Sequence, residues 1–370
     1  MATIKDVAAK ACVSIATVSR ILNKKGKYSE ETESRVHKAA EELGYTPNLT
    51  AKSLKTGLTG TIGIAIKEYF LLHYPVLLHN AIKVLTKQNY SVEIILNAKM
   101  KDCVNLLNRG QFDGLLIACI DNDEHALRSL IKSRRNFVFL GGSIEREDVN
   151  MIEIDYFQGG YIATQHLINL GHDNILFIED NENLFFTQEI KRGYLFALDE
   201  SGIQYKENLI VYGDHTYSEP GEFTGYNSVR RLISKRQPAK QVAFTKPFRS
   251  LEDKANRHNH QQSGWLRNGR EADFSAVLTT DDKIAYGALK ALKDGGLRVP
   301  ADKSIIGFGN LSSSEYLSPP LTTVEIPLSQ MGELGAEILV NNIKRRDSII
   351  KRVKLKIRLA QRETLSKRLT

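Results

Sequence analysis

Several features are scarce in this chain, and each scarcity excludes a class of protein. No stretch approaches the roughly 18 uninterrupted apolar residues of a membrane-spanning helix. The N-terminus shows no apolar segment with a cleavage site, so we expect neither membrane insertion nor export. Cysteine occurs three times in 370 residues, as Cys12, Cys103 and Cys119. This odd number, in no metal-ligand spacing, predicts a reducing cytoplasm and no disulfide framework.

Catalytic motifs are also missing. The chain has no G-x-S-x-G, no P-loop, no quartet of metal ligands and no G-x-G-x-x-G after a strand. His258 and His260 have no third ligand beside them, so a metal site is a poor interpretation. We therefore expect no enzyme, no metal and no cofactor. A hydrophobic share of 42% allows a sizeable buried core, and a net charge of +8 suits a polyanionic partner.

Two short amphipathic helices are predicted in the first 23 residues. Thr3 and Asp6 indicate a capping box for a helix over about residues 4–11. Ser14 indicates the N-cap of a second helix over residues 15–22, whose apolar side faces the first. The other side of this second helix carries compact or hydrogen-bonding side chains. The pattern is typical of a helix-turn-helix whose second helix enters the major groove of DNA.

A third helix, over residues 29–43 and ended by Gly44, completes a small all-α head. Residues 1–60 contain ten lysines and arginines against six acids, a net +4, and basic groups lie on the first two helices and on the exit segment. Residues 47–59 follow as a hinge, in which Asn48 can cap a two-turn helix. Two turns are not stable alone, because nucleation costs more than so few hydrogen bonds return. The hinge is therefore either a plain linker or a segment that folds on DNA.

The segments T-I-K-D-V-A-x-K-A-x-V-S-x-A-T-V-S-R-I-L-N and E-L-G-Y-x-P-N-x-x-A-x-S-L resemble the lactose/galactose repressor (LacI/GalR) family of bacterial transcriptional regulators. The resemblance continues at Ser318–Val324 and Arg362–Thr364, and so covers nearly the whole chain. The head departs at Cys12, where the family usually has glycine or asparagine and where we expect a small buried thiol. The resemblance implies a homodimeric repressor, rather than an activator, on a palindromic operator.

Roles in DNA binding follow from the resemblance, residue by residue. Ile15 and Ala16 match the principal base-reading positions, and being apolar they can only contact thymine methyl groups or exclude other bases. Arg20 matches a further base reader that could bind a guanine. The residue matching Leu54 wedges between base pairs in the minor groove. Helix packing is the alternative role for Thr17 and Ser19. The full expected DNA-binding set is Thr3, Ser14, Ile15, Ala16, Thr17, Ser19, Arg20, Asn23, Asn48, Ala51, Leu54 and Lys55.

From Gly60 onward, short apolar strands alternate with amphipathic helices, which predicts two doubly wound parallel-sheet lobes of five or six strands each. The resemblance implies a periplasmic-binding-protein architecture crossed by three chain segments. We expect a head (1–46), a hinge (47–59) and a core (60–370), with an N-lobe of about 60–156 and 308–324 and a C-lobe of about 157–307 and 325–370. The expected strands are Thr61–Ile66, Ser91–Leu96, Gly114–Cys119, Phe137–Leu140, Met151–Ile154, Asn174–Ile178, Ala276–Thr279, Ser304–Gly307 and Thr323–Glu325. The expected helices lie near Pro75–Gln88, Glu124–Lys132, Phe157–Leu170, Gln188–Ser201, Gly221–Ser234, Asp282–Lys293 and Gln330–Arg345.

The resemblance also implies an effector site between the lobes. Its apolar wall would be Leu72, Tyr74 and Leu78, its sugar-binding acids Asp155 and Asp281, and its stacking group His215 or Tyr217. Helix capping or loop packing is the alternative role for each. We expect a repressor of a carbohydrate-utilisation operon, with a sugar or sugar derivative as its effector. Two departures leave the identity of the effector open: Ile190 stands where sugar-binding members have arginine, and Gly309 where they have aspartate. The alternatives to a simple sugar are a larger glycoside, a phosphorylated or other non-sugar metabolite, or control by a protein partner. A solute-binding protein is the remaining alternative.

Two further stretches are unusual in composition. Residues 239–272 form a polar insertion with seven basic and three acidic residues, either a solvated loop or a docking surface. In the basic tail, Val353, Leu355, Ile357 and Leu359 alternate as in a strand, so its charges are expected on the solvent-exposed face.

Overall fold

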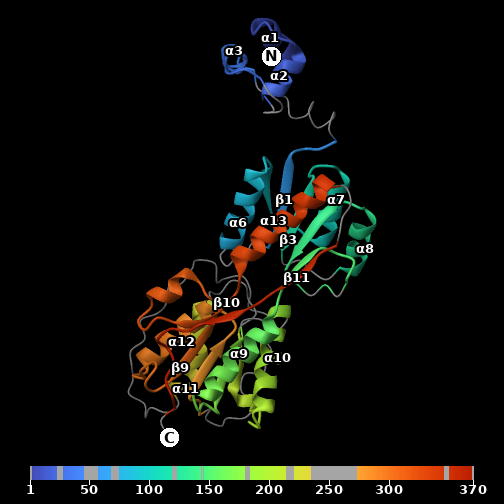
Figure 1. The fold of residues 1–370 in the computed structure, drawn as a ribbon. Coiled ribbons are helices and arrows are strands. Elements are labelled where there is room, and N and C mark those ends of the chain that lie inside the picture. The colour runs from blue at the N-terminus through green and yellow to red at the C-terminus, as the bar shows by residue number, and fades with distance from the viewer. Residues whose placement is uncertain are drawn as a thin grey trace, which may run out of the picture.

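Figure 1 shows the chain as a computed structural model, in which a small helical head precedes two α/β lobes. In this structure no helix is long and apolar enough to cross a membrane, as far as the described residues extend. The structure describes residues 2–22, 28–45, 57–67, 75–118, 123–142, 144, 146–179, 184–213, 221–234, 273–345 and 350–368.

The head consists of α1 (Ile4–Lys10), α2 (Ile15–Leu22) and α3 (Glu30–Glu42), which confirms the three predicted helices. The helices enclose their own hydrophobic core, in which Val7, Val18, Ile21 and Val36 are fully buried. Ser29 caps α3, because its hydroxyl accepts the N–H of Thr32 at 3.3 Å. The head therefore has its own core and its own caps.

The N-lobe is built on a six-stranded parallel sheet in the order β11-β5-β4-β3-β1-β2. Helix α13 packs against α6 and against strands β3, β4 and β5. The strands are β1 (Thr61–Ile66), β2 (Ser91–Leu96), β3 (Gly114–Ala118), β4 (Asn136–Leu140), β5 (Met151–Ile154) and β11 (Arg352–Leu355), and the helices are α6 (Pro75–Lys87), α7 (Met100–Asn108), α8 (Glu124–Lys132) and α13 (Leu328–Arg345).

The C-lobe repeats this plan in the order β12-β10-β9-β8-β6-β7, with β12 antiparallel to β10. Two helix pairs, α9 with α10 and α11 with α12, make its closest helix contacts. The strands are β6 (Ile175–Glu179), β7 (Ile210–Tyr212), β8 (Ala276–Thr279), β9 (Ser304–Gly309), β10 (Thr322–Glu325) and β12 (Arg358–Ala360). The helices are α9 (Tyr156–Asn169), α10 (Phe185–Glu200), η1 (Glu207–Leu209), α11 (Gly221–Ser234), α12 (Asp282–Asp294) and η2 (Ser312–Tyr316).

The expected division of the core into lobes is wrong in its second half. Strands β9 and β10 belong to the C-lobe sheet, so residues 308–324 do not lie in the N-lobe. Helix α13 and strand β11 belong to the N-lobe instead of the C-lobe. The reason is that the chain crosses between the lobes after Glu325, at the end of β10, and not before residue 308. The tail, expected as one strand, forms two strands in different sheets, with a third crossing between Leu355 and Arg358.

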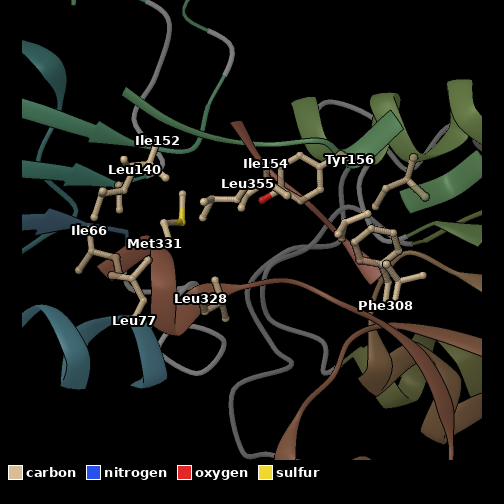
Figure 2. Packing of buried hydrophobic residues seen from close by; sticks show 14 of the residues in the cluster. Ile66, Leu77, Leu140, Ile152, Ile154, Tyr156, Phe308, Leu328, Met331 and Leu355 are labelled. Atoms are coloured by element: carbon tan, nitrogen blue, oxygen red, sulfur yellow. The ribbon is translucent and has the colours of Figure 1, made fainter. Parts of the chain in front are cut away.

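One hydrophobic cluster continues through the crossings from lobe to lobe (Figure 2). Ile66, Leu140 and Met331 represent the N-lobe in this cluster. On the C-lobe side, the ring of Tyr156 stacks on Phe308 with centroids 6.3 Å apart. The carboxyl ends of both sheets, where ligands bind in such folds, are thus held together by buried apolar contacts.

Candidate functional site

Helix α2 is fixed in the head by its cap and by its buried side. The Ser14 hydroxyl accepts the backbone N–H of Thr17 at 3.1 Å and lies 2.8 Å from the Thr17 hydroxyl. Val18 and Ile21 are fully buried against the other two helices. A capped helix with a buried inner side presents its outer side in one orientation, as base reading in a groove requires.

The outer side of α2 carries the residues expected to read bases. Ile15 is 45% exposed, and Ala16 and Arg20 are also exposed. Thr17 and Ser19 are half-buried, and the Thr17 hydroxyl is already close to Ser14. Covering the exposed side chain of Ile15 with a thymine methyl group would remove apolar surface from water, which favours binding.

Thr3 and Asp6 form the predicted capping box at the start of α1. The Thr3 backbone N–H and hydroxyl both donate to Asp6 Oδ2, at 2.7 and 2.8 Å. The backbone N–H of Thr3 holds the pKa of Asp6 below its ordinary value, so the carboxylate stays charged. Lys10 then joins α1 to α3 through an ion pair with Glu42 at 2.7 Å.

Cys12 differs from the expectation of a buried thiol, because its side chain is exposed. It lies in the turn between α1 and α2 with φ at +53°, the left-handed conformation in which glycine and asparagine are favoured. The turn is therefore kept as the resemblance requires, with a residue that adopts it at an energetic cost.

Five expected DNA-binding residues lie outside the described residues. They are Asn23, Asn48, Ala51, Leu54 and Lys55, and the predicted hinge helix goes with them. Their roles remain predictions.

Three of the expected effector residues are described, and each already has structural partners. Leu78 is 7% exposed and belongs to the cluster that joins the lobes. Asp155 caps α9, accepting the N–H of Gln158 at 3.0 Å, and pairs with Lys354 at 2.6 Å. Asp281 caps α12, accepting the N–H of Lys283 at 2.7 Å. Their ligand contacts remain predictions. Leu72, Tyr74, His215, Tyr217 and the insertion 239–272 lie outside the described residues.

The position at which the resemblance implies an arginine in sugar-binding members is closed to ligand in this structure. Ile190 is fully buried, with its backbone against Gly160 of α9. The neighbouring Lys191 binds Glu179 and the Tyr212 hydroxyl, both at 3.2 Å. Arg192, the next residue, has an exposed side chain that binds Glu189 at 2.6 Å. Neither cation takes the place of the missing arginine.

Asp282 is a site residue that sequence reasoning missed. Its buried carboxylate accepts the Leu311 N–H and the Ser314 hydroxyl at 2.7 Å and the Thr323 hydroxyl at 2.5 Å. It thereby ties the start of α12 to the loop after β9 and to β10. Burial raises the pKa of Asp282 to about 6, against the lowering effect of its hydroxyl donors. The doublet Asp281-Asp282 was the available signal, since only one of two adjacent acids can cap the helix.

The carboxylate of Asp282 also faces the position of the second missing ligand group. A Cβ on Gly309 would lie 3.9 Å from Asp282 Oδ2, and Gly309 has φ at +128°. An aspartate at residue 309 would therefore be strained and close to a like charge. Within the described part of the chain, no three histidine, cysteine or acidic side chains gather in a way that could hold a metal ion.

Comparison with known proteins decides the family. Residues 3–48 match the family described as bacterial regulatory proteins, lacI family, and residues 69–232 match the periplasmic binding proteins and sugar binding domain of the LacI family. Residues 164–365 match a periplasmic binding protein-like domain, more than half of the chain. The chain belongs to the lacI family. It is a DNA-binding transcriptional repressor of that family and not an enzyme.

Individual lacI-family relatives match over almost their full length. The HTH-type transcriptional repressor PurR of Aliivibrio salmonicida (strain LFI1238) is 31% identical, over 93% of each chain. PurR of Aliivibrio fischeri (strain ATCC 700601 / ES114) is 30% identical over 100% of each chain. These PurR relatives do not confirm the expected carbohydrate-utilisation operon, which stays a prediction.

Solved lacI-family structures share the fold. A lac repressor dimer bound to operator and an anti-inducer aligns with a TM-score of 0.76, at 22% identity over 99% of each chain. A complex of the transcriptional regulator CelR with cellobiose aligns with a TM-score of 0.64, at 26% identity over 98% of this chain and 100% of that one. The predicted two-lobed, periplasmic-binding-protein-like core is confirmed.

Proposed function

We propose that this repressor binds a palindromic operator as a homodimer, and that a molecule bound between its lobes controls its affinity for DNA. The observation that carries the proposal is the fixed helix α2, whose outer side exposes Ile15, Ala16 and Arg20 together. Each copy would read one half-site with this side, so two copies related by a twofold axis match a palindrome.

Exposed apolar side chains support a homodimer. In the N-lobe, Val76 on α6 and Ile94 and Leu96 on β2 are between 42% and 49% exposed. Strand β2 is an edge of its sheet, where uncovered apolar side chains favour association. In the C-lobe, Phe223 on α11 is 41% exposed and Tyr316 is 80% exposed. In Figure 1, α6 and the α11–α12 pair lie on the same side of the molecule, which suits one interface along both lobes.

The two departures at residues 190 and 309 argue against a free monosaccharide as the controlling molecule. A charged arginine fork and a carboxylate are strong hydrogen-bonding groups for sugar hydroxyls, and this chain has a buried isoleucine and a glycine there. A larger glycoside, of which the cellobiose bound to CelR is an example, or a phosphorylated metabolite has further groups that could be bound elsewhere between the lobes. A coupling of about 1–3 kcal/mol between this site and the head changes DNA affinity about 5–150-fold.

Selection of genomic DNA fragments by the purified full chain tests the operator proposal. We expect a twofold-symmetric site to be enriched at physiological salt, in the absence or presence of sugars, sugar phosphates and nucleobases. Arg20→Ala should cost about 1–3 kcal/mol on that site and relax one base position in each half-site. Arg35→Ala, which removes the same charge from the exposed side of α3, is the matched control and should relax no position.

An outcome with no fragment preferred over random competitor, under all these conditions, would contradict the proposal. An equal loss on every sequence for Arg20→Ala would leave Arg20 as a phosphate contact and not a base reader.

A further inference from the structure

The outer face of the α9–α10 pair carries aromatic side chains that neither the core nor the proposed dimer face uses. The ring of Phe196 lies 5.6 Å from Phe157 and 5.9 Å from Tyr161, centroid to centroid. Phe196 is 49% exposed. The guanidinium of Arg192 lies 4.8 Å from the centre of the Phe157 ring. Contiguous aromatic and arginine groups of this kind are enriched in protein interfaces.

Charged groups are arranged symmetrically about Phe196 along α10. Arg192 lies one helical turn before Phe196, and Glu200 lies one turn after it, so the three side chains share one side of the helix. The Arg192 side chain is 65% exposed and binds Glu189 at 2.6 Å. Glu200 accepts the Tyr161 hydroxyl at 2.6 Å. The α10 patch, defined as Phe157, Tyr161, Arg192, Phe196 and Glu200, therefore has a cation at one end and an anion at the other.

A surface with this arrangement is complementary to itself. If two α10 helices meet antiparallel about a twofold axis through Phe196, the two Phe196 rings face each other. Arg192 of each copy then lies opposite Glu200 of the other, which gives two identical ion pairs. Twofold contacts require that a patch match its own copy in this way, whereas binding of an unrelated protein gives no reason for the symmetry.

We propose that the α10 patch binds the α10 patch of a second copy, and that this contact joins two DNA-binding dimers into a tetramer. In Figure 1, α10 lies on the side of the C-lobe away from α11 and α12, so the contact leaves the proposed dimer interface free. A tetramer of this kind carries two pairs of heads and can hold two operators at once. The tetramer rests on the proposed homodimer, but the self-complementary patch does not.

Sedimentation of the full chain over a range from nanomolar to tens of micromolar tests the contact. We expect the mass of two chains at low concentration and of four chains at high concentration. Phe196→Glu should stay at two chains throughout, because two like charges would meet at the axis. Tyr205→Glu, at another exposed aromatic of the same lobe (45% exposed), is the matched control and should still reach four chains.

Charge reversal separates a contact between copies from an effect within one chain. Arg192→Glu and Glu200→Arg should each weaken the four-chain state at least tenfold, and the double variant should restore it. Residues 192 and 200 are two turns apart, about 12 Å along the helix, so restoration requires a pair across the interface. Circular dichroism of each variant checks that the fold is kept. Failure of the double variant to restore association would overturn the proposal.

The other possible outcomes of these experiments also test the tetramer contact. If the unaltered chain stays at two chains at every concentration, the tetramer is wrong, even where operator binding succeeds. If Phe196→Glu reduces two chains to one, the patch is the dimer interface and the proposed second contact is overturned. If four chains form and Phe196→Glu abolishes them while no operator is selected, the tetramer stands and only the proposed function fails. Once an operator is identified, the Phe196→Glu variant should bind one operator fragment normally but should no longer bridge two operator fragments.

Discussion

The head and the C-lobe both place polar groups at the start of a helix, but they draw these groups from very different distances along the chain. In the head, Ser14 and Thr3 bind partners three residues away, and these contacts are exposed. In the C-lobe, Asp282 binds groups that lie 29, 32 and 41 residues away, and it is fully buried.

This difference determines how much stability each region loses when one of these contacts is removed. An exposed cap can be replaced by water, so its loss costs little more than the bond. A buried carboxylate that joins three segments has no such replacement, and its donors would be left unsatisfied. The head is thus a local unit that depends on its small core, while the C-lobe end of the molecule depends on a few long-range polar contacts.

The largest expected effect follows from removing the long-range contact. Asp282→Ala should destabilise the core by about 3–5 kcal/mol, because the Leu311 N–H and two hydroxyls lose their acceptor in a buried site. Asp281→Ala, which removes a local cap next to it, should cost only about 1 kcal/mol. Scanning calorimetry of the core transition measures both. Equal losses for the two variants would contradict the distinction between local and long-range contacts.

The pH dependence of stability gives a second test at the same residue. Folding raises the pKa of Asp282 from 3.8 to about 6, so the folded state holds a proton that the unfolded state releases. The stability contributed by this group is therefore present in full below pH 3.8 and is lost as the pH rises to about 6. Asp282→Asn keeps the shape and should remove this part of the slope. The same slope between pH 4.5 and 6.5 in both proteins would contradict it.

A core substitution in the head tests whether the head is a separate unit. Ile21→Ala should destabilise the head by about 2–5 kcal/mol through the cavity it leaves, and operator binding should be lost with it. The melting transition of the core should stay unchanged, since the two hydrophobic clusters share no residue. Ile15→Ala, on the exposed side of the same helix, should change stability by less than about 0.5 kcal/mol. A fall in the core transition with Ile21→Ala would show that the two regions are coupled.

The same distinction between local and long-range contacts separates what could be predicted from the sequence from what could not. The N-cap residues and amphipathic periods predicted α1, α2 and α3 to within a residue or two, because each signal acts over three or four residues. Helix α7 and strand β7 were missed. For α7 a signal was present, because Asp102 accepts the N–H of Lys99 at 2.9 Å at the start of the helix, whereas the three residues of β7 are too few to show a period. Asp155 and Asp281 each cap a helix, which was the alternative role predicted for them from their places just before helices.

Long-range features escaped prediction for a physical reason. The lobe boundary after Glu325 depends on which sheet accepts each strand, and alternating apolar residues suit either sheet. The alternation of Val353, Leu355, Ile357 and Leu359 was identified, yet nothing in it shows that two sheets share the segment. The role of Asp282 depends on Thr323, which neighbours it only in the fold.

Restoring the missing family carboxylate is expected to fail at the C-lobe end. Gly309→Asp should destabilise the core by about 1–3 kcal/mol, because φ at +128° suits glycine alone. Free monosaccharides should not raise the melting temperature of the Gly309→Asp variant. Gly309→Ala has the same strain without the charge and should cost less than Gly309→Asp. An unchanged melting temperature together with a new shift from a monosaccharide would show that the backbone, and with it the proposed ligand preference, had been misjudged.

The smallest effect lies in the turn of the head and tests local strain directly. Cys12→Asn should stabilise the head by up to about 1 kcal/mol, because asparagine tolerates φ at +53° better than cysteine does. Cys12→Ala removes the thiol but keeps the strain and should bring no gain. Arg134→Asn, at the same φ of +53° in the N-lobe, should give a gain of similar size in the core transition. Hydrogen exchange of the head amides measures the first pair, and a gain from Cys12→Ala alone would place the cost in the thiol and not in the backbone.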